Sequence, residues 1–79
     1  MAIYIQIRKL SEDNAVALYS FGALNEIIGK IKISKSSGAI SLVEITDSAR
    51  TQFYLSRVGR KLAQHFEKGE FPDETCYAA

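Results

Sequence analysis

The order of its apolar patterns constrains the fold of this chain more than any other feature. Short segments in which apolar and polar residues alternate fill the first half, and one amphipathic helix pattern follows them. Alternation is typical of half-buried strands, and apolar residues spaced by three and four are typical of a helix. This order predicts an α+β fold, a four-stranded antiparallel β-meander with one C-terminal helix packed on one face (ββββα).

The 79 residues are enough for a single domain, 1–79. The predicted strands span residues 2–10, 15–21, 26–34 and 39–45, and the helix spans 49–68. The tail, 70–79, is expected to lie extended against the body through Phe71 and Tyr77.

The alternation assigns each strand two faces. Ile3, Ile5 and Ile7 share one face of the first strand, and Ile27, Ile31 and Ile33 share one face of the third. The face turned away from the helix is then expected to carry Tyr4, Tyr19, Phe21, Ile28, Ile40 and Leu42, bordered by Gln6, Arg8, Lys30 and Lys32. An uncovered antiparallel face is normally polar, so an apolar one indicates a contact surface.

The link between the last two strands is the most specific local signal. The sequence KSSG at 35–38 favours a turn with Gly38 in the left-handed region, followed by a bulge. That turn sets Lys30 opposite Glu44 and Ile31 opposite Val43, which places Val43 and Ile45 on the core side. A register with Ile40 and Leu42 inside is the alternative.

A stripe at helical spacing defines the buried side of the helix. It consists of Thr51, Leu55, Val58, Leu62 and Phe66, with Tyr54 and His65 at its border. Thr46, Asp47 and Ser48 offer N-cap oxygens, and Gly69 is expected to end the helix as a left-handed cap.

Composition favours a soluble cytoplasmic protein. The single cysteine, Cys76, cannot form an internal disulfide. No segment has the pattern of a signal peptide or the roughly 20 apolar residues of a membrane span. The formal net charge of +1 is low for a dedicated nucleic-acid binder.

The sequence offers little to catalysis. It has no phosphate-binding glycine loop, and its only histidine, His65, borders the core stripe. Cys76 has no visible activating partner, and the carboxylates fall mainly in turns, at helix ends and in the tail. We therefore expect no catalytic residue, no metal site and no cofactor, and a protein that is not an enzyme.

Three surfaces remain as candidate partner-binding sites. The first is the open sheet face, with Tyr4, Tyr19, Phe21 and Ile28; the alternative is that the tail covers it. The second is the outer side of the helix, where Phe53 lies among Arg57, Arg60 and other basic residues, a combination common in binding hot spots. An ordinary solvated helix face is the alternative there. The third is the acidic turn that contains Glu12 and Asp13.

Residues 29–42 (GKIKISKSSGAISL), the following helix and residues 67–72 (EKGEFP) resemble small bacterial immunity proteins. Residues 3–7 (IYIQI) and 19–22 (YSFG) fit the same resemblance. Such proteins accompany polymorphic toxins, including those of contact-dependent growth inhibition. The resemblance implies a cytoplasmic inhibitor that binds a cognate toxin domain, for example a nuclease. Glu12 and Asp13 could engage a basic active site of such a toxin.

Two other functions stay open. A nucleic-acid-binding regulator would use the sheet aromatics or the basic helix face. A homodimer would form through the open sheet face.

Overall fold

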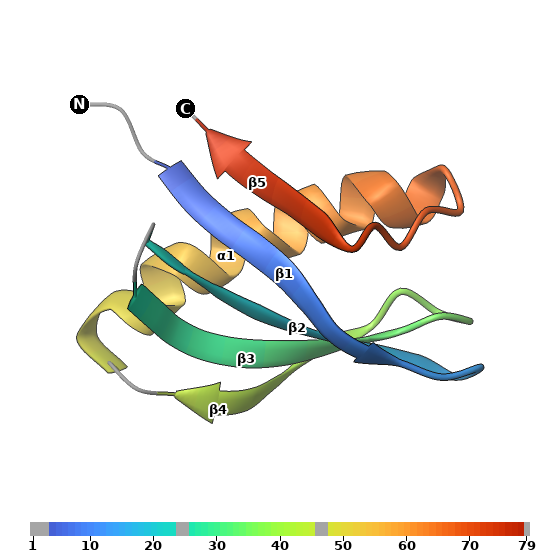
Figure 1. Cartoon of the computed structure of the whole chain (residues 1–79), viewed down its shortest axis with the longest axis horizontal. Helices are drawn as coiled ribbons and strands as arrows, with labels where there is room; N and C mark the ends of the chain where they lie inside the picture. The colour runs from blue at the N-terminus through green and yellow to red at the C-terminus, as the bar shows by residue number, and fades with distance from the viewer. Residues whose placement is uncertain (1–3, 24–25, 46–47, 79) are drawn as a thin grey trace.

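The computed structural model describes residues 4–23, 26–45 and 48–78. Its elements are β1 (Tyr4–Glu12), β2 (Val16–Ala23), β3 (Glu26–Ser34), β4 (Ile40–Ile45), α1 (Ser48–Glu67) and β5 (Glu74–Ala78). The strands form one antiparallel sheet in the order β4-β3-β2-β1-β5, and α1 crosses one face of it (Figure 1). The predicted class, the meander and the helix are confirmed, and a fifth strand is added.

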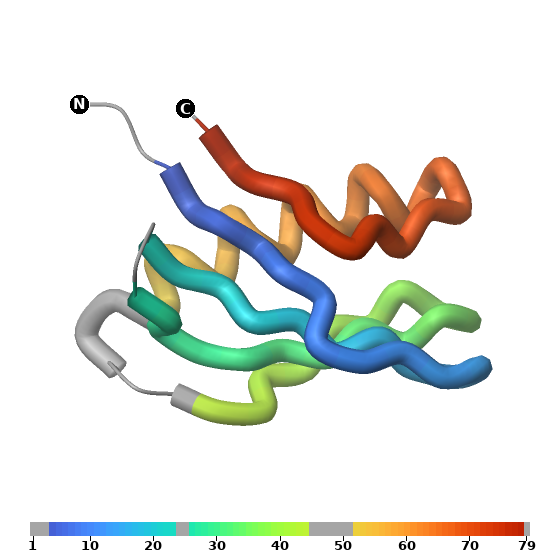
Figure 2. Tube along the Cα trace, viewed as in Figure 1, coloured from blue at the N-terminus to red at the C-terminus, as the bar shows by residue number. Residues whose placement is uncertain are grey.

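The fifth strand is formed by the segment predicted as an extended tail. β5 runs beside β1, with Tyr4 opposite Ala78 and Arg8 opposite Glu74 (Figure 2). Polar contacts hold the preceding loop on the helix side of the sheet. The Tyr19 hydroxyl donates to the Pro72 carbonyl over 2.9 Å, and the Lys9 ammonium donates to the Phe71 carbonyl over 3.0 Å.

The core lies between α1 and the inner face of the sheet. Its fully buried residues are Ile5, Ile7, Ala17, Tyr19, Phe21, Ile28, Ile31, Ile33, Val58 and Leu62. Phe66, Phe71 and Tyr77 pack against this cluster and are partly buried. Burial of these aromatic and branched side chains is the main source of stability in a domain of this size.

Three predicted outer-face residues, Tyr19, Phe21 and Ile28, lie in this core, so their predicted placement is wrong. Ile7 pairs with Phe21, and directly paired residues share a face, so Tyr19 and Phe21 turn inward with the β1 isoleucines. On β3, a bulge opposite Phe21 and Gly22 inserts Ile28 as an extra residue. The insertion turns Ile28 inward and Ile27 outward, opposite to the prediction.

A second bulge decides the register of β4. Lys30 lies opposite Glu44, as predicted, with their charged atoms 3.2 Å apart. Between Lys30 and Ile31 the register shifts, so Ile31 pairs with Leu42 instead of Val43. Ile40 consequently packs on the core and Val43 is exposed, as the alternative register predicts at this end. Leu42 pairs with the inward Ile31 but remains 38% exposed. The side chain of Ile45 lies outside the described part.

The turn and the helix end follow their local signals. Gly38 has a φ of 77° and Gly69 a φ of 71°, which confirms both left-handed positions. The amides of Gly69 and Glu70 donate to the carbonyls of Phe66 and His65, the pattern of a Schellman cap. Val58 and Leu62 of the predicted stripe are buried. The predicted N-cap residues Thr46 and Asp47, and the side chains of Ser48 and Thr51, lie outside the described part of the chain.

Candidate functional site

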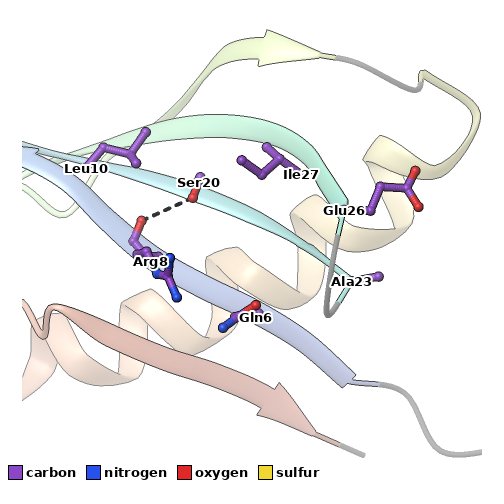
Figure 3. Close-up of a pocket in the computed structure, with 7 residues that line it drawn as sticks. All are labelled: Gln6, Arg8, Leu10, Ser20, Ala23, Glu26 and Ile27. Carbon is purple, nitrogen blue, oxygen red and sulfur yellow. Dashed lines mark hydrogen bonds between the residues drawn. The ribbon is translucent and has the colours of Figure 1, made fainter.

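The sheet face opposite α1, which we call the outer face, contains a hollow of about 490 Å³. Figure 3 shows its lining side chains on β1, β2 and β3, with α1 behind the sheet. The lining consists of Gln6, Arg8, Leu10, Ser20, Ala23, Glu26 and Ile27. The hollow therefore combines apolar side chains with an amide, a hydroxyl, a cation and a carboxylate.

Apolar side chains on the outer face are strongly exposed. Ile27 is 56% exposed, Tyr4 50% and Leu10 46%. Leu10 lies two residues after Arg8 on β1, so the alternation of the strand places it on the same outer face. Large exposed apolar groups next to a hollow are typical of a contact surface.

The outer face is not covered by the C-terminal segment. β5 extends the sheet at its edge, beyond β1. Phe71, in the loop before β5, and Tyr77, on β5, pack against the core on the inner side. Cys76 pairs with Gln6 and thus lies on the outer face at this edge. In the part of the chain that the structure describes, the outer face over β1 to β3 therefore stays open.

Of the predicted outer-face residues Tyr4, Tyr19, Phe21 and Ile28, only Tyr4 lies there. Sequence reasoning missed Leu10, Ser20 and Ile27. Leu10 follows the alternation of β1, the β1–β2 register sets Ser20 opposite Arg8, and the β3 bulge turns Ile27 outward. Gly22, on β2 opposite the β3 bulge, is a residue from which the bulge could have been predicted. A Cβ on Gly22 would lie 1.9 Å from the Glu26 carbonyl oxygen, a backbone approach that only glycine permits.

The second predicted surface, on α1, contains a stacked pair. Phe53 is 43% exposed, and the Arg57 guanidinium lies 3.7 Å from the centre of its ring. Arg57 also donates to the Phe53 carbonyl over 3.1 Å, and Arg60 is exposed one turn further on. This arrangement is a cation–π contact within the helix, open to solvent.

The third predicted surface, the acidic turn, is engaged within the chain. Glu12 accepts hydrogen bonds from the Lys35 and Lys9 ammonium groups, which lower its pKa to about 2. One Asp13 carboxylate oxygen accepts from the amides of Ala15 and Val16, both over 2.7 Å, and these bonds lower its pKa as well. Both side chains therefore stabilise the turn in which they lie.

His65 connects the end of α1 to β5. Its Nδ1 lies 3.1 Å from Glu70 Oε1, and its Nε2 lies 3.0 Å from Thr75 Oγ1. Thr75 pairs with the buried Ile7, so its hydroxyl faces the helix and not the hollow. The contact fixes the helix end, in agreement with the predicted border position of His65.

No protein-family model matches the chain, and no curated protein or solved structure matches it either. Among the described residues, no helix has the length and apolar character needed to cross a lipid bilayer. Residues 4–23, 26–45 and 48–78 contain no group of three His, Cys, Asp or Glu side chains placed to hold a metal ion. The surface chemistry of the chain is therefore the basis for assigning a function.

Proposed function

We propose that this chain is a small cytoplasmic protein-binding module that docks through the outer face of its sheet. The observation that carries the proposal is the hollow between the exposed side chains of Leu10 and Ile27. Burying these groups and filling the hollow would release water from apolar surface, the main driving force of protein association. In line with the resemblance to immunity proteins, the partner is a toxin domain that the module binds and inhibits.

The alternative, a nucleic-acid-binding regulator, has less support. Its first form required aromatic rings on the open sheet face, and Tyr19 and Phe21 are buried under the helix. Its second form uses the helix, where the Arg57 guanidinium already covers the Phe53 ring. The exposed Arg60 belongs to that face, and a salt-dependent shift with single-stranded RNA or duplex DNA would support this form.

The experiment is co-expression with the product of the neighbouring gene, which this proposal predicts to contain a toxin domain. The wild-type chain is expected to restore growth and to co-purify with the toxin domain. Ile27→Arg, on the outer face, is expected to abolish both, because it places a charge on the hollow. Phe53→Ser, on the helix face, is the matched control and is expected to retain both.

Each outcome is decisive for the surface or for the function. Loss of binding with Phe53→Ser alone would place the contact on α1 and reject the outer face. Failure of the wild-type chain to bind the toxin domain or to rescue growth would reject the immunity function. Far-ultraviolet circular dichroism of both variants establishes that they remain folded.

A further inference from the structure

Four charged side chains and one serine form a row across the outer face, with one residue on each strand. In strand pairing, Glu74 lies opposite Arg8, Arg8 opposite Ser20, Ser20 opposite Lys30, and Lys30 opposite Glu44. Directly paired residues share a face, and Ser20 and Arg8 line the hollow, so the whole row lies on the outer face. We call these five residues the charged row.

The order of charge along this row is the same from both ends. It runs negative, positive, neutral, positive, negative, from the β5 edge to the β4 edge. The two outer pairs are direct contacts, with Arg8 Nε 3.1 Å from Glu74 Oε1 and Lys30 Nζ 3.2 Å from Glu44 Oε2. The exposed Lys32, which shares its face with Lys30 on β3, adds positive charge near the centre. Glu26, at the start of β3, adds negative charge at the Ala23 end of the hollow, away from the row.

This symmetry disfavours stacking of two copies through their outer faces. Two identical sheets can stack their rows about a two-fold axis that runs either along the row or along the strands. Because the charges are ordered alike from both ends, either axis places cation over cation and carboxylate over carboxylate when the rows stack centre on centre, with Ser20 over Ser20. Like charges brought together in an interface oppose association, whereas a complementary pattern speeds and favours it.

We propose that the outer face is built for a protein surface with an acidic centre and basic flanks, and not for a second copy. This inference rests on the proposed function, whose docking face it shares. The partner would set carboxylates over Arg8 and Lys30, set basic side chains over Glu74 and Glu44, and insert an apolar group beside Ile27. The charged row thereby selects the partner, while Leu10 and Ile27 supply apolar contact.

A reversed copy of this protein serves as the probe. The variant Arg8→Glu, Lys30→Glu, Glu44→Lys, Glu74→Lys keeps each neighbouring pair opposite in charge but inverts the whole row. Wild type and variant are each expected to sediment as monomers, and an equimolar mixture is expected to form a heterodimer. The association should weaken at least tenfold when sodium chloride rises from about 20 mM to about 500 mM, because salt screens exposed charges.

Two controls make the result specific. A variant with Arg57→Glu and Arg60→Glu inverts charge on the helix face and is expected to give no association with the wild type. Amide shifts of labelled wild-type protein in the productive mixture are expected around Arg8, Ile27 and Lys30. Thermal unfolding of the reversed copy establishes that it is folded before it is mixed.

The inference is overturned if the wild-type chain dimerises through its outer face, or if the folded reversed copy and the wild type stay monomeric when mixed. Neither result decides whether the chain binds a toxin domain, which the Ile27→Arg experiment tests separately. Loss of the toxin domain on Ile27→Arg would still identify the outer face as the docking site. Conversely, toxin binding that survives Ile27→Arg would reject that docking face whatever the reversed copy does.

Discussion

Glu12 lies between two lysines that come from different parts of the chain. Lys9 precedes it on β1, and Lys35 belongs to the turn between β3 and β4. The Lys35 ammonium also donates to the Asp13 carbonyl over 2.9 Å and lies 5.3 Å from the centre of the Phe71 ring. The Glu12 carboxylate therefore joins two turns near the loop that leads into β5.

The lowered pKa of Glu12 predicts an acid-sensitive contribution to stability. The group has an ordinary pKa of 4.5 and a folded pKa of about 2. Its contribution is complete above about pH 4.5 and is lost as the pH falls toward 2, because the unfolded state takes up the proton first and both states are protonated below pH 2. Glu12→Gln should lower the urea midpoint at pH 7, and its deficit against wild type should shrink between pH 4.5 and pH 2.

Glu67→Gln, which changes an exposed glutamate near the end of α1, is the matched control and should leave the midpoint nearly unchanged at pH 7. Asp13 retains its lowered pKa in the Glu12 variant, so some acid dependence should persist there. A deficit that stays constant from pH 7 to pH 2 would show that Glu12 acts through packing and not through its charge.

Among the strands, sequence periodicity predicts existence and order but not every face. Both faces of β2 and β3 carry apolar residues, so alternation alone does not say which side is inside. Each of the three register shifts, in β1–β2, β2–β3 and β3–β4, then inverts the faces beyond it. Ile27 and Ile28 exchange sides for this reason, so the candidate site contains Ile27 instead of Ile28.

The helix and its C-terminal cap are predictable because their signals are local. The spacing of Leu55, Val58, Leu62 and Phe66 and the position of Gly69 depend only on residues nearby in sequence. β5 was missed because five residues with no clear alternation form a strand only by pairing with β1, about 70 residues earlier. Non-local pairing of this kind leaves no trace in a local pattern.

Two glycines in different elements should respond oppositely to alanine. A Cβ on Gly59 would lie 3.7 Å from Ile40 Cδ1, an ordinary contact, so Gly59→Ala should stabilise the protein by about 0.5–1 kcal/mol through helix propensity. A Cβ on Gly29 would lie 2.7 Å from the Glu44 carbonyl oxygen and 3.0 Å from the Phe21 ring. Gly29→Ala should therefore destabilise by about 1–3 kcal/mol.

Denaturant unfolding of the two glycine variants, fitted with a common slope, measures both changes. Equal signs would contradict the assignment of Gly59 to an open position and Gly29 to a crowded one. Circular dichroism of Gly29→Ala distinguishes a destabilised native state from an altered strand pairing.

The molecule as a whole is closed by its last strand. β5 covers the edge of β1, and the loop before it is held by Tyr19, Lys9 and the contacts of His65. α1 contacts every strand, including β5. Tyr77 of β5 packs against the core that lies between the helix and the sheet. The sheet is therefore stabilised from an end of the chain that the periodicity assigned to a tail.

Ending the chain after Asp73 tests this closure. The truncation removes the β1–β5 ladder, the Thr75 partner of His65 and the Tyr77 ring that packs on the core. Loss of a strand should cost several kcal/mol, against a total stability of about 5–15 kcal/mol for a small domain, so the shortened chain should lose its cooperative thermal transition. A chain that ends after Tyr77 keeps the ring and most of the ladder, and should melt within a few degrees of wild type. A cooperative transition near the wild-type temperature after truncation at Asp73 would mean that β1 to β4 and α1 form a complete domain by themselves, with β5 an accessory edge.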